Sequence, residues 1–277
     1  MKFSQKAAEI FYPTGQRTIS DTTHLCIGAH QDDIEIMAYG AIAECYGDPN
    51  KHFSGVVLTD GGGSPRSGVY ESFTDEDMKK IRATEQKTAA TIGRYLCQVL
   101  MAHPSSAVKD SSNTNIKNEL IELFTEMRPT VVLTHNLADK HDTHLATALH
   151  VIRALRELPK ELRPKQLIAM EVWRGLDWLS DEAKIAADTS KYPNVSAALL
   201  GVFDSQISGG KRYDLASDGR RLSNATFFAS HSVDELTSCS FGMDMTKLMC
   251  ESTPADFISF YLDEFKKDVL DRIGKFV

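Results

Sequence analysis

Short runs of apolar and β-branched residues alternate with helical patterns along the first 172 residues. Five runs have the pattern of strands, at residues 23–30, 53–60, 98–102, 130–135 and 166–172. Helical patterns lie between them, at residues 34–46, 75–92, 115–127 and 143–158. Strands separated by helices indicate βαβ units, and the nearly unbroken apolar character of VVLTD and TVVLTH is typical of strands covered on both faces. The pattern therefore predicts an α/β fold with a mainly parallel sheet and helices on both faces.

The pattern weakens after about residue 172, where three further elements are expected. They are an amphipathic helix, a strand or loop that returns to the site, and a C-terminal helix, at residues 194–206, 220–231 and 254–277. No linker-like stretch precedes this part, so we expect a single domain over residues 1–277. Its Rossmann-like core should span about residues 20–172, and its C-terminal extension about residues 173–277.

Composition narrows the classes of partner. The chain has 31 Lys and Arg against 38 Asp and Glu, a net charge of −7, which disfavours a general nucleic-acid binder. No window approaches the roughly 18 apolar residues of a membrane span, and the N-terminal segment MKFSQKAAEIFYP lacks the apolar core of a secretory signal. Five scattered cysteines without CxxC spacing are typical of reduced thiols. We expect a cytoplasmic protein that acts on a small molecule, and the C-terminal tail leaves a homo-oligomer open.

Polar residues follow the first predicted strand in the segment AHQDDIE, residues 29–35. In open α/β sheets, ligands bind beyond the carboxyl ends of the strands. His30, Asp32 and Asp33 therefore stand where a site is expected. Acidic residues also cap helices and suit the positive end of a helix dipole, so this segment alone leaves a structural and a functional interpretation open.

A second polar segment, HNLADKHDTH at residues 135–144, follows another predicted strand. It holds three of the nine histidines of the chain, and it should emerge at the same edge of the sheet as the first segment. Imidazole and carboxylate without thiolate suit zinc or another first-row divalent ion. The two segments offer His30, one of the two aspartates, and one of His141 or His144 as ligands. The aspartate that does not bind metal could take a proton from water.

The segments AHQDDIE and HNLADKHDTH together resemble the LmbE/PIG-L family of zinc-dependent de-N-acetylases, whose motifs are AHPDDxE and HxDH or HxxH. The resemblance covers the chain from about residue 23 to about residue 150. It implies a hydrolase that removes the acetyl group from an N-acetylglucosamine-type sugar conjugate. Zn²⁺, or another first-row divalent metal, would be its cofactor.

The resemblance also assigns roles to single residues. It implies that His30, Asp33 and His144 bind the zinc ion, that Asp32 is the general base, and that His141 supports the oxyanion. Two departures from the family pattern occur here. Gln31 replaces the usual proline, and Thr143 stands where many members have the Asp of HxDH, with Asp142 one place earlier.

Several residues are candidates for substrate contact. The segment RATEQKTAATIG is similar to the family pattern RxxExxxAxxxLG, which implies that Arg82 lies near the substrate and that Glu85 braces the site. Further candidates follow predicted strands, stand in the second motif, or come from the extension: Asp60, His103, Asp142 and His231. Trp173 and Trp178 are expected to pack in the core rather than against a sugar.

Two alternative functions remain open at the level of the sequence. His30, Asp32 and His144 also fit the two-histidine, one-carboxylate triad of non-haem Fe(II) oxygenases. Those enzymes are usually built on β-rich folds, and the second aspartate and His141 would have no role in one. The third interpretation is a non-catalytic sugar- or nucleotide-binding module, whose function would not depend on Asp32.

Overall fold

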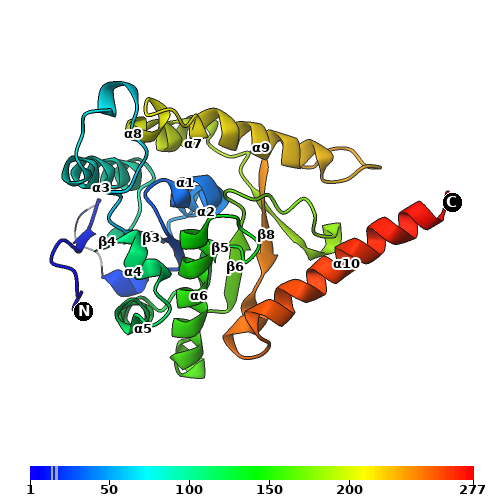
Figure 1. Ribbon diagram of the computed structural model, residues 1–277, viewed down its shortest axis with the longest axis horizontal. Coiled ribbons are helices and arrows are strands. Elements are labelled where there is room, and N and C mark those ends of the chain that lie inside the picture. The colour runs from blue at the N-terminus through cyan, green and yellow to red at the C-terminus, as the bar shows by residue number, and fades with distance from the viewer. Residues whose placement is uncertain (14, 16–17) are drawn as a thin grey trace.

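The computed structural model describes residues 1–13, 15 and 18–277 of the chain (Figure 1). Within these residues the strands form one eight-stranded sheet in the order β1-β4-β3-β2-β5-β6-β8-β7. The five central strands run parallel to one another. They are β2 (His24–Gly28), β3 (Phe53–Thr59), β4 (Cys97–His103), β5 (Val131–His135) and β6 (Gln166–Met170). This confirms the predicted α/β fold with a mainly parallel sheet.

Antiparallel strands complete both edges of the sheet. At one edge β1 (Glu9–Phe11) pairs with β4. At the other edge β8 (Cys239–Asp244) pairs with β6, and β7 (Lys184–Asp188) pairs with β8. Two strands of the C-terminal extension therefore continue the sheet of the core. The sequence pattern did not predict them, and β7 is only partly buried along its length.

Helices cover both faces of the sheet and enclose two apolar cores. One core contains side chains of helices α5 (Thr114–Met127) and α6 (Asp142–Glu157), next to α4 (Ser105–Lys109). The other contains side chains of helices α1 (Asp33–Met37), α2 (Tyr39–Gly47), α3 (Asp75–Ile92) and α7 (Pro193–Gly201). The remaining helices are α8 (Asp204–Ile207), α9 (Tyr213–Phe227) and α10 (Pro254–Gly274). The predicted cover on both faces is confirmed.

Alternate residues of the central strands face opposite cores, which explains their unbroken apolar sequence. In β2, Leu25 and Ile27 belong to one core and Cys26 to the other. In β3, Val56 and Val57 divide in the same way. Every residue of both strands is buried, as expected for strands covered on two faces.

Local capping signals placed several helices well. Thr74 and Asp77 form a reciprocal capping box that starts α3 at the predicted residue. The helix expected at residues 34–46 is instead divided into α1 and α2 at Ala38, whose φ of −108° and ψ of 14° leave the helical region. The segment expected to be a helix at residues 194–206 is likewise divided, into α7 and α8. The predicted C-terminal helix is confirmed as α10.

The prediction of a strand or loop at residues 220–231 is wrong, because most of this segment belongs to helix α9. The buried face of α9 consists of polar and small side chains: Ser217, Arg221, Asn224 and Ala225. Their spacing is helical, but a search for apolar periodicity does not detect it. Arg221 donates to the carbonyl oxygen of Glu35 (2.7 Å), and Asn224 donates to that of Cys239 (3.3 Å).

All five cysteines are free thiols in the structure, as expected from their spacing. None of the helices in the described part of the chain is long and apolar enough to cross a membrane.

A buried hydrogen-bonded pair of side chains joins the end of β4 to α5. Nε2 of His103 lies 2.8 Å from Oε2 of Glu119, and the two residues are 1% and 4% exposed. The backbone N–H of Ser4 donates to the same carboxylate at 2.8 Å. Burial alone would raise the pKa of Glu119, but the hydrogen bonds from His103 and Ser4 lower it.

We expect Glu119→Ala to lower the free energy of unfolding by about 3 kcal/mol, because it leaves a buried imidazole without its partner. A carboxylate whose pKa is lowered on folding stabilises the fold at neutral pH and loses this contribution as the pH falls. The difference between the variant and the wild type should therefore shrink below pH 4.5, the ordinary pKa of this group. Urea unfolding at several pH values measures it.

Glu122→Ala is the matched control, since Glu122 is exposed on the same helix and accepts only from the backbone N–H of Lys2. A loss of stability equal to that of Glu119→Ala, or one that does not change with pH, would contradict a buried charged pair.

Candidate active site

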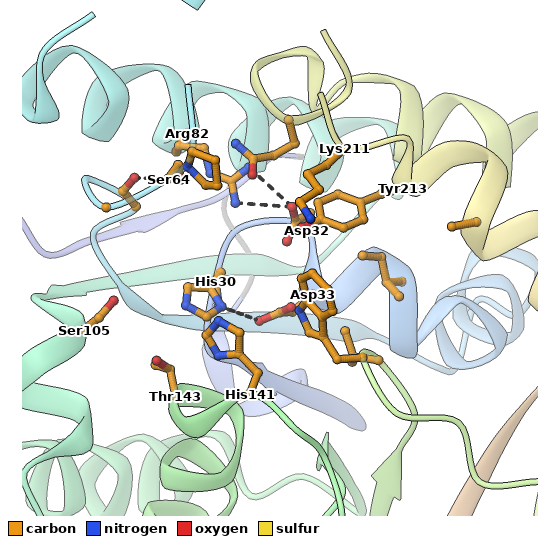
Figure 2. A pocket seen from close by; sticks show the side chains of 18 of the residues that line it. His30, Asp32, Asp33, Ser64, Arg82, Ser105, His141, Thr143, Lys211 and Tyr213 are labelled. Atoms are coloured by element: carbon orange, nitrogen blue, oxygen red, sulfur yellow. Dashed lines mark hydrogen bonds and ion pairs between the residues drawn. The ribbon is translucent and has the colours of Figure 1, made fainter. Parts of the chain in front are cut away.

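The two polar segments meet beyond the carboxyl ends of the parallel strands. Strands β2 and β5 are neighbours, but the chain continues from β2 to β3 on one side and from β5 to β6 on the other. A crevice forms at such a topological switch point, because the connecting segments diverge there. The loops after β2 and β5 carry the two predicted motifs into this crevice (Figure 2).

Three side chains from these loops bring donor atoms together, and we call them the donor triangle: His30, Asp33 and His144. Nδ1 of His30 lies 3.2 Å from Oδ2 of Asp33 and 3.2 Å from Nε2 of His144. Nε2 of His144 lies 3.3 Å from Oδ1 of Asp33. A tetrahedral zinc ion with bonds of about 2.0–2.1 Å requires neighbouring donors about 3.3 Å apart. Both the chemistry and the spacing of the triangle therefore fit a first-row divalent ion.

His135 lies behind the triangle. Among the described residues, the groups close enough to share a metal ion are His30 with His141 and His144, and Asp33 with His135 and His144. Nε2 of His135 accepts a hydrogen bond from the backbone N–H of Ala29 at 2.9 Å, so this lone pair is already used. Its ring stacks on His144 with 3.9 Å between centroids. Burial lowers the pKa of His135 to about 4. His135 is thus a neutral support for the triangle, a role for which the sequence contained no separate signal.

Asp139 is the carboxylate that faces the far nitrogen of His144. Its Oδ2 lies 3.5 Å from Nδ1 of His144, and it is held by the backbone N–H groups of His141 (3.0 Å) and Trp173 (3.1 Å). Burial alone would lower the pKa of His144, but Asp33 and Asp139 outweigh it and raise the pKa to about 9. A carboxylate in this position fixes the orientation and tautomer of a ligand histidine. Asp142, the neighbour considered from the sequence, is exposed in the first turn of α6.

Asp32 turns away from the triangle toward the cavity. Its φ of 98° is rarely adopted by a residue with a side chain, and such strain is typical of functional sites. Its backbone N–H donates to Oε1 of Gln86 at 3.2 Å, and its Oδ2 lies 3.3 Å from Nη2 of Arg82. Burial raises the pKa of Asp32 to about 6, against the opposing effect of Arg82. This carboxylate is therefore suited to exchange protons near neutral pH.

Arg82 and Glu85 project from α3 and connect the site to the C-terminal extension. Arg82 is 2% exposed, lines the cavity, and also donates to the carbonyl oxygen of Gln31. The carboxylate of Glu85 accepts from the backbone N–H and the hydroxyl of Ser205, both at 2.7 Å. The extension is thereby attached directly behind the arginine that holds Asp32.

His141 stands at the mouth of the triangle. Its ring centroid lies 4.9 Å from that of His30 and 4.5 Å from that of His144. Its Nδ1 is buried and has no hydrogen-bond partner among the residues that the structure describes. Burial lowers the pKa of this imidazole. A neutral ring with a free nitrogen here can bind a metal ion or contact a reacting group.

A cavity of about 750 Å³ opens above these residues. The C-terminal extension supplies much of its wall, including Trp173, Gln206, Lys211, Tyr213 and Arg220. Figure 2 shows Lys211 and Tyr213 beside Asp32. Trp173 packs against one of the two cores as expected, but it is only half-buried: its ring also lines the cavity and lies nearly parallel to that of His141, with 6.1 Å between centroids. Trp178 packs against the other core.

Four residues predicted to contact substrate do not line this cavity: Asp60, His103, Asp142 and His231. Asp60 pairs with Lys79 at 3.3 Å in the turn after β3. His103 is buried in its pair with Glu119. His231 is exposed in a turn after α9, since the segment that carries it is a helix and does not return to the site. These residues were chosen because they follow a strand, stand in a motif or come from the extension, and these criteria did not determine where their side chains point.

Comparison with known proteins agrees with this geometry. Residues 25–155 match the sequence model of a family described as PIG-L, GlcNAc-PI de-N-acetylase. The matched segment of the chain is thus similar to the PIG-L family. The family match identifies a hydrolase of the de-N-acetylase type. No curated protein matches the chain significantly in sequence.

Several solved structures share the fold of this protein at low sequence identity. N,N'-diacetylchitobiose deacetylase from Pyrococcus horikoshii is 16% identical with a TM-score of 0.64, and the match covers 84% of this chain and 87% of that one. The 4-carboxy-2-hydroxymuconate hydratase GalB from Pseudomonas putida KT2440 is 16% identical with a TM-score of 0.61 (81% and 96% covered). The zinc-inhibited form of teicoplanin deacetylase Orf2 is 15% identical with a TM-score of 0.56 (80% and 97% covered).

The position of Asp139 predicts that Asp139→Asn weakens metal binding about 10- to 100-fold, because His144 loses the carboxylate that orients it. Competition with a chromophoric chelator, with Zn²⁺ as the probe ion, measures the affinity. Asp142→Asn is the control, since this exposed carboxylate lies only three residues along the chain, and its affinity should equal that of the wild type. Equal affinities for all three proteins would show that Asp139 does not support the site.

Proposed function

We propose that this protein uses Zn²⁺ to hydrolyse the amide of an N-acetylglucosamine-type sugar conjugate, releasing acetate and a free amine. The observation that carries the proposal is the donor triangle with a second, unligated carboxylate beside it, at the base of a cavity. The family match supports the amide as the bond that is broken. The deacetylases that share the fold are consistent with a sugar substrate.

In this proposal His30, Asp33 and His144 hold the ion. A divalent ion in that position supplies Lewis-acid polarisation of the acyl carbonyl and of water. Asp32 takes a proton from the water as its oxygen forms a bond to the acyl carbon. Asp32 then gives that proton to the nitrogen as the carbon–nitrogen bond breaks, so that acetate and amine leave.

His141 and Arg82 assist these steps without exchanging protons themselves. The free ring nitrogen of His141 carries a hydrogen that donates to the oxygen on which negative charge develops, a contribution on the order of a few kcal/mol. Arg82 holds the carboxylate of Asp32 at 3.3 Å and fixes its direction. Its positive charge also prevents the pKa of Asp32 from rising further in this buried site.

The cavity supports a substrate of the size of a sugar conjugate. A volume of about 750 Å³ is within the range of small-molecule sites. The half-buried indole of Trp173 offers an aromatic face beside His141, where the apolar face of a sugar ring can pack. We place the sugar on this side of the triangle for that reason.

We also propose that the protein works in a reducing compartment such as the cytoplasm. Its five cysteines are free thiols, and Cys26, Cys97 and Cys239 are buried. An oxidising compartment normally selects for paired cysteines.

Proteins with other chemistries share this fold. GalB shares the fold and is a hydratase, and addition of water to a carbon–carbon double bond would release no amine. The oxygenase alternative, with Asp32 as its carboxylate ligand, still leaves Asp33 and His141 without a role. A binding module does not account for a strained carboxylate whose pKa is raised to about 6.

We expect the zinc-loaded protein to release primary amine from members of a panel of N-acetylated amino sugars and their conjugates. Asp32→Asn should reduce kcat by about 10²- to 10⁴-fold, since it removes the proton acceptor. The zinc content of the variant, measured by elemental analysis, should equal that of the wild type.

Asp60→Asn serves as the control, because Asp60 lies after the neighbouring strand but does not line the cavity. Full activity of Asp32→Asn, with its metal retained, would rule out the proposed base. Release of no amine from any member of the panel, together with hydration of an unsaturated acid, would identify a hydratase instead.

A further inference from the structure

The outer wall of the cavity is strongly cationic. Four basic side chains line it in addition to Arg82: Lys109, Lys140, Lys211 and Arg220. Among the described residues that line the cavity, the carboxylates are Asp32 and Asp33, and both are buried in the site below. The chain as a whole has a net charge of −7. This local excess of positive charge therefore runs against the overall charge of the protein.

Two of these lysines approach the same aromatic ring. Nζ of Lys140 lies 5.8 Å from the ring centroid of Trp173, and Nζ of Lys211 lies 5.1 Å from it. Lys140 comes from the loop between β5 and α6, and Lys211 from the segment between α8 and α9. Neither has an ion pair with a carboxylate among the residues that the structure describes. A cation–π contact at an exposed site contributes only about 0.5–1 kcal/mol, while two ammonium groups near one ring repel each other.

The indole ring of Trp173, which both lysines approach, is held next to the donor triangle. The backbone N–H of Trp173 donates to Asp139, which faces His144. The indole lies nearly parallel to His141, with 6.1 Å between centroids and 27° between planes. The lysines are thus separated from the reacting centre by a single aromatic ring. A sugar ring with its acyl group at the triangle would extend over a similar span.

We propose that Lys140 and Lys211, whose ammonium groups both lie near the ring of Trp173, form a subsite for an anionic group attached to the amino sugar. The group is a phosphate or a carboxylate, and it neutralises the two ammonium groups while the sugar packs near the indole. Arg220 stands close by, held by its hydrogen bond to the carbonyl oxygen of Val172. This inference rests on the proposed function and adds a substrate class to it.

The test compares matched substrates that differ only in charge: N-acetylglucosamine 1-phosphate, the carboxymethyl glycoside of N-acetylglucosamine, and the methyl glycoside. The wild-type protein should show a kcat/KM at least about tenfold higher for an anionic substrate than for the methyl glycoside. The double variant Lys140→Gln/Lys211→Gln should lose about tenfold or more on that anionic substrate, and should stay within twofold of the wild type on the methyl glycoside. The better of the two anionic substrates identifies the group.

Lys165→Gln is the charge control. Lys165 is exposed and directly precedes β6, so it lies at the amino ends of the parallel strands, away from the cavity at their carboxyl ends. Equal losses on charged and neutral substrates, or no preference in the wild type, would overturn the subsite. If no substrate releases amine, the proposed function fails, and calorimetry then tests the subsite alone. Binding of N-acetylglucosamine 1-phosphate at least tenfold tighter than N-acetylglucosamine, lost in the double variant, supports it; equal affinities overturn it.

A second inference concerns α10, which runs outward from the body of the molecule to the C-terminus (Figure 1). Apolar side chains recur on it at spacings of three and four residues, which places them on one face. They are Ile258, Leu262, Phe265, Val269 and Ile273, and we call them the α10 stripe. Ile258 packs against the core, but Leu262, Val269 and Ile273 are 48%, 38% and 53% exposed.

The charges of α10 indicate what covers the stripe. Its first half carries Asp263 and Glu264, which have no ion pair among the described residues. In its second half Lys267 pairs with Asp271 and Arg272 with Asp268. This leaves an excess of two further cations there, Lys266 and Lys275. The helix is therefore acidic near the body and basic near its end, so two copies are complementary when they run antiparallel.

We infer that the α10 stripe pairs with the same stripe of a second copy of this chain, in an antiparallel arrangement. Such an interface is isologous, because each copy presents the same surface to the other, and it closes as a dimer. The acidic half of each helix then faces the basic half of its partner. Pairing buries the exposed apolar side chains that the monomer leaves in water.

Light scattering after size-exclusion chromatography at micromolar concentration should show a dimer for the wild type and a monomer for Leu262→Asp/Val269→Asp. Phe260→Asp is the control, because Phe260 is 59% exposed but lies on another face of the helix, and this variant should remain a dimer. Unchanged thermal unfolding confirms that the monomeric variant is folded. A monomeric wild type, or one that floats with phosphatidylcholine vesicles, would overturn the inference.

Discussion

The convergence of two imidazole nitrogens and one carboxylate, 3.2–3.3 Å from one another, is the constraint on which the rest of the site depends. His30 and Asp33 reach it from the loop after β2, and His144 from the start of α6 more than a hundred residues later. Only the adjacency of β2 and β5 brings them together. The switch in strand order leaves room above them, so the same feature produces both the ligand set and its cavity.

Holding so many polar groups in a buried site requires an equally buried supporting network. Gln86 accepts from the backbone N–H of Asp32 and donates to Glu35 at 2.8 Å. Glu35 also accepts from the hydroxyl of Tyr95 at 2.7 Å, and burial raises its pKa to about 8. A carboxyl group that stays protonated at neutral pH adds no further negative charge beneath Asp32 and Asp33. The network therefore supports the strained backbone of Asp32 without disturbing the charge balance of the site.

The C-terminal extension is part of the site, because it bonds to the helices that carry the site residues and lines the cavity. Ser205 bonds to Glu85, and Arg221 bonds to the carbonyl oxygens of Glu35 and Ile36, so the extension is fastened to the helices that carry the motif. It also supplies Trp173 and Lys211 to the cavity wall. The family match ends at residue 155. The donor triangle thus lies within the matched segment, while the extension supplies part of the cavity wall above it.

Local features of the sequence determined the parallel sheet, most helix boundaries and the two polar segments that meet at the candidate site. Unbroken apolar runs, the capping box at Thr74 and two polar segments after strands are all signals within a few residues of one another. Tertiary structure decided the remainder. Asp139 rather than Asp142 faces His144, α9 is a helix with a polar buried face, and Lys140 meets Lys211 at Trp173. Each of these depends on side chains distant in sequence that become neighbours only when the extension folds back over the sheet, and no local pattern records such a contact.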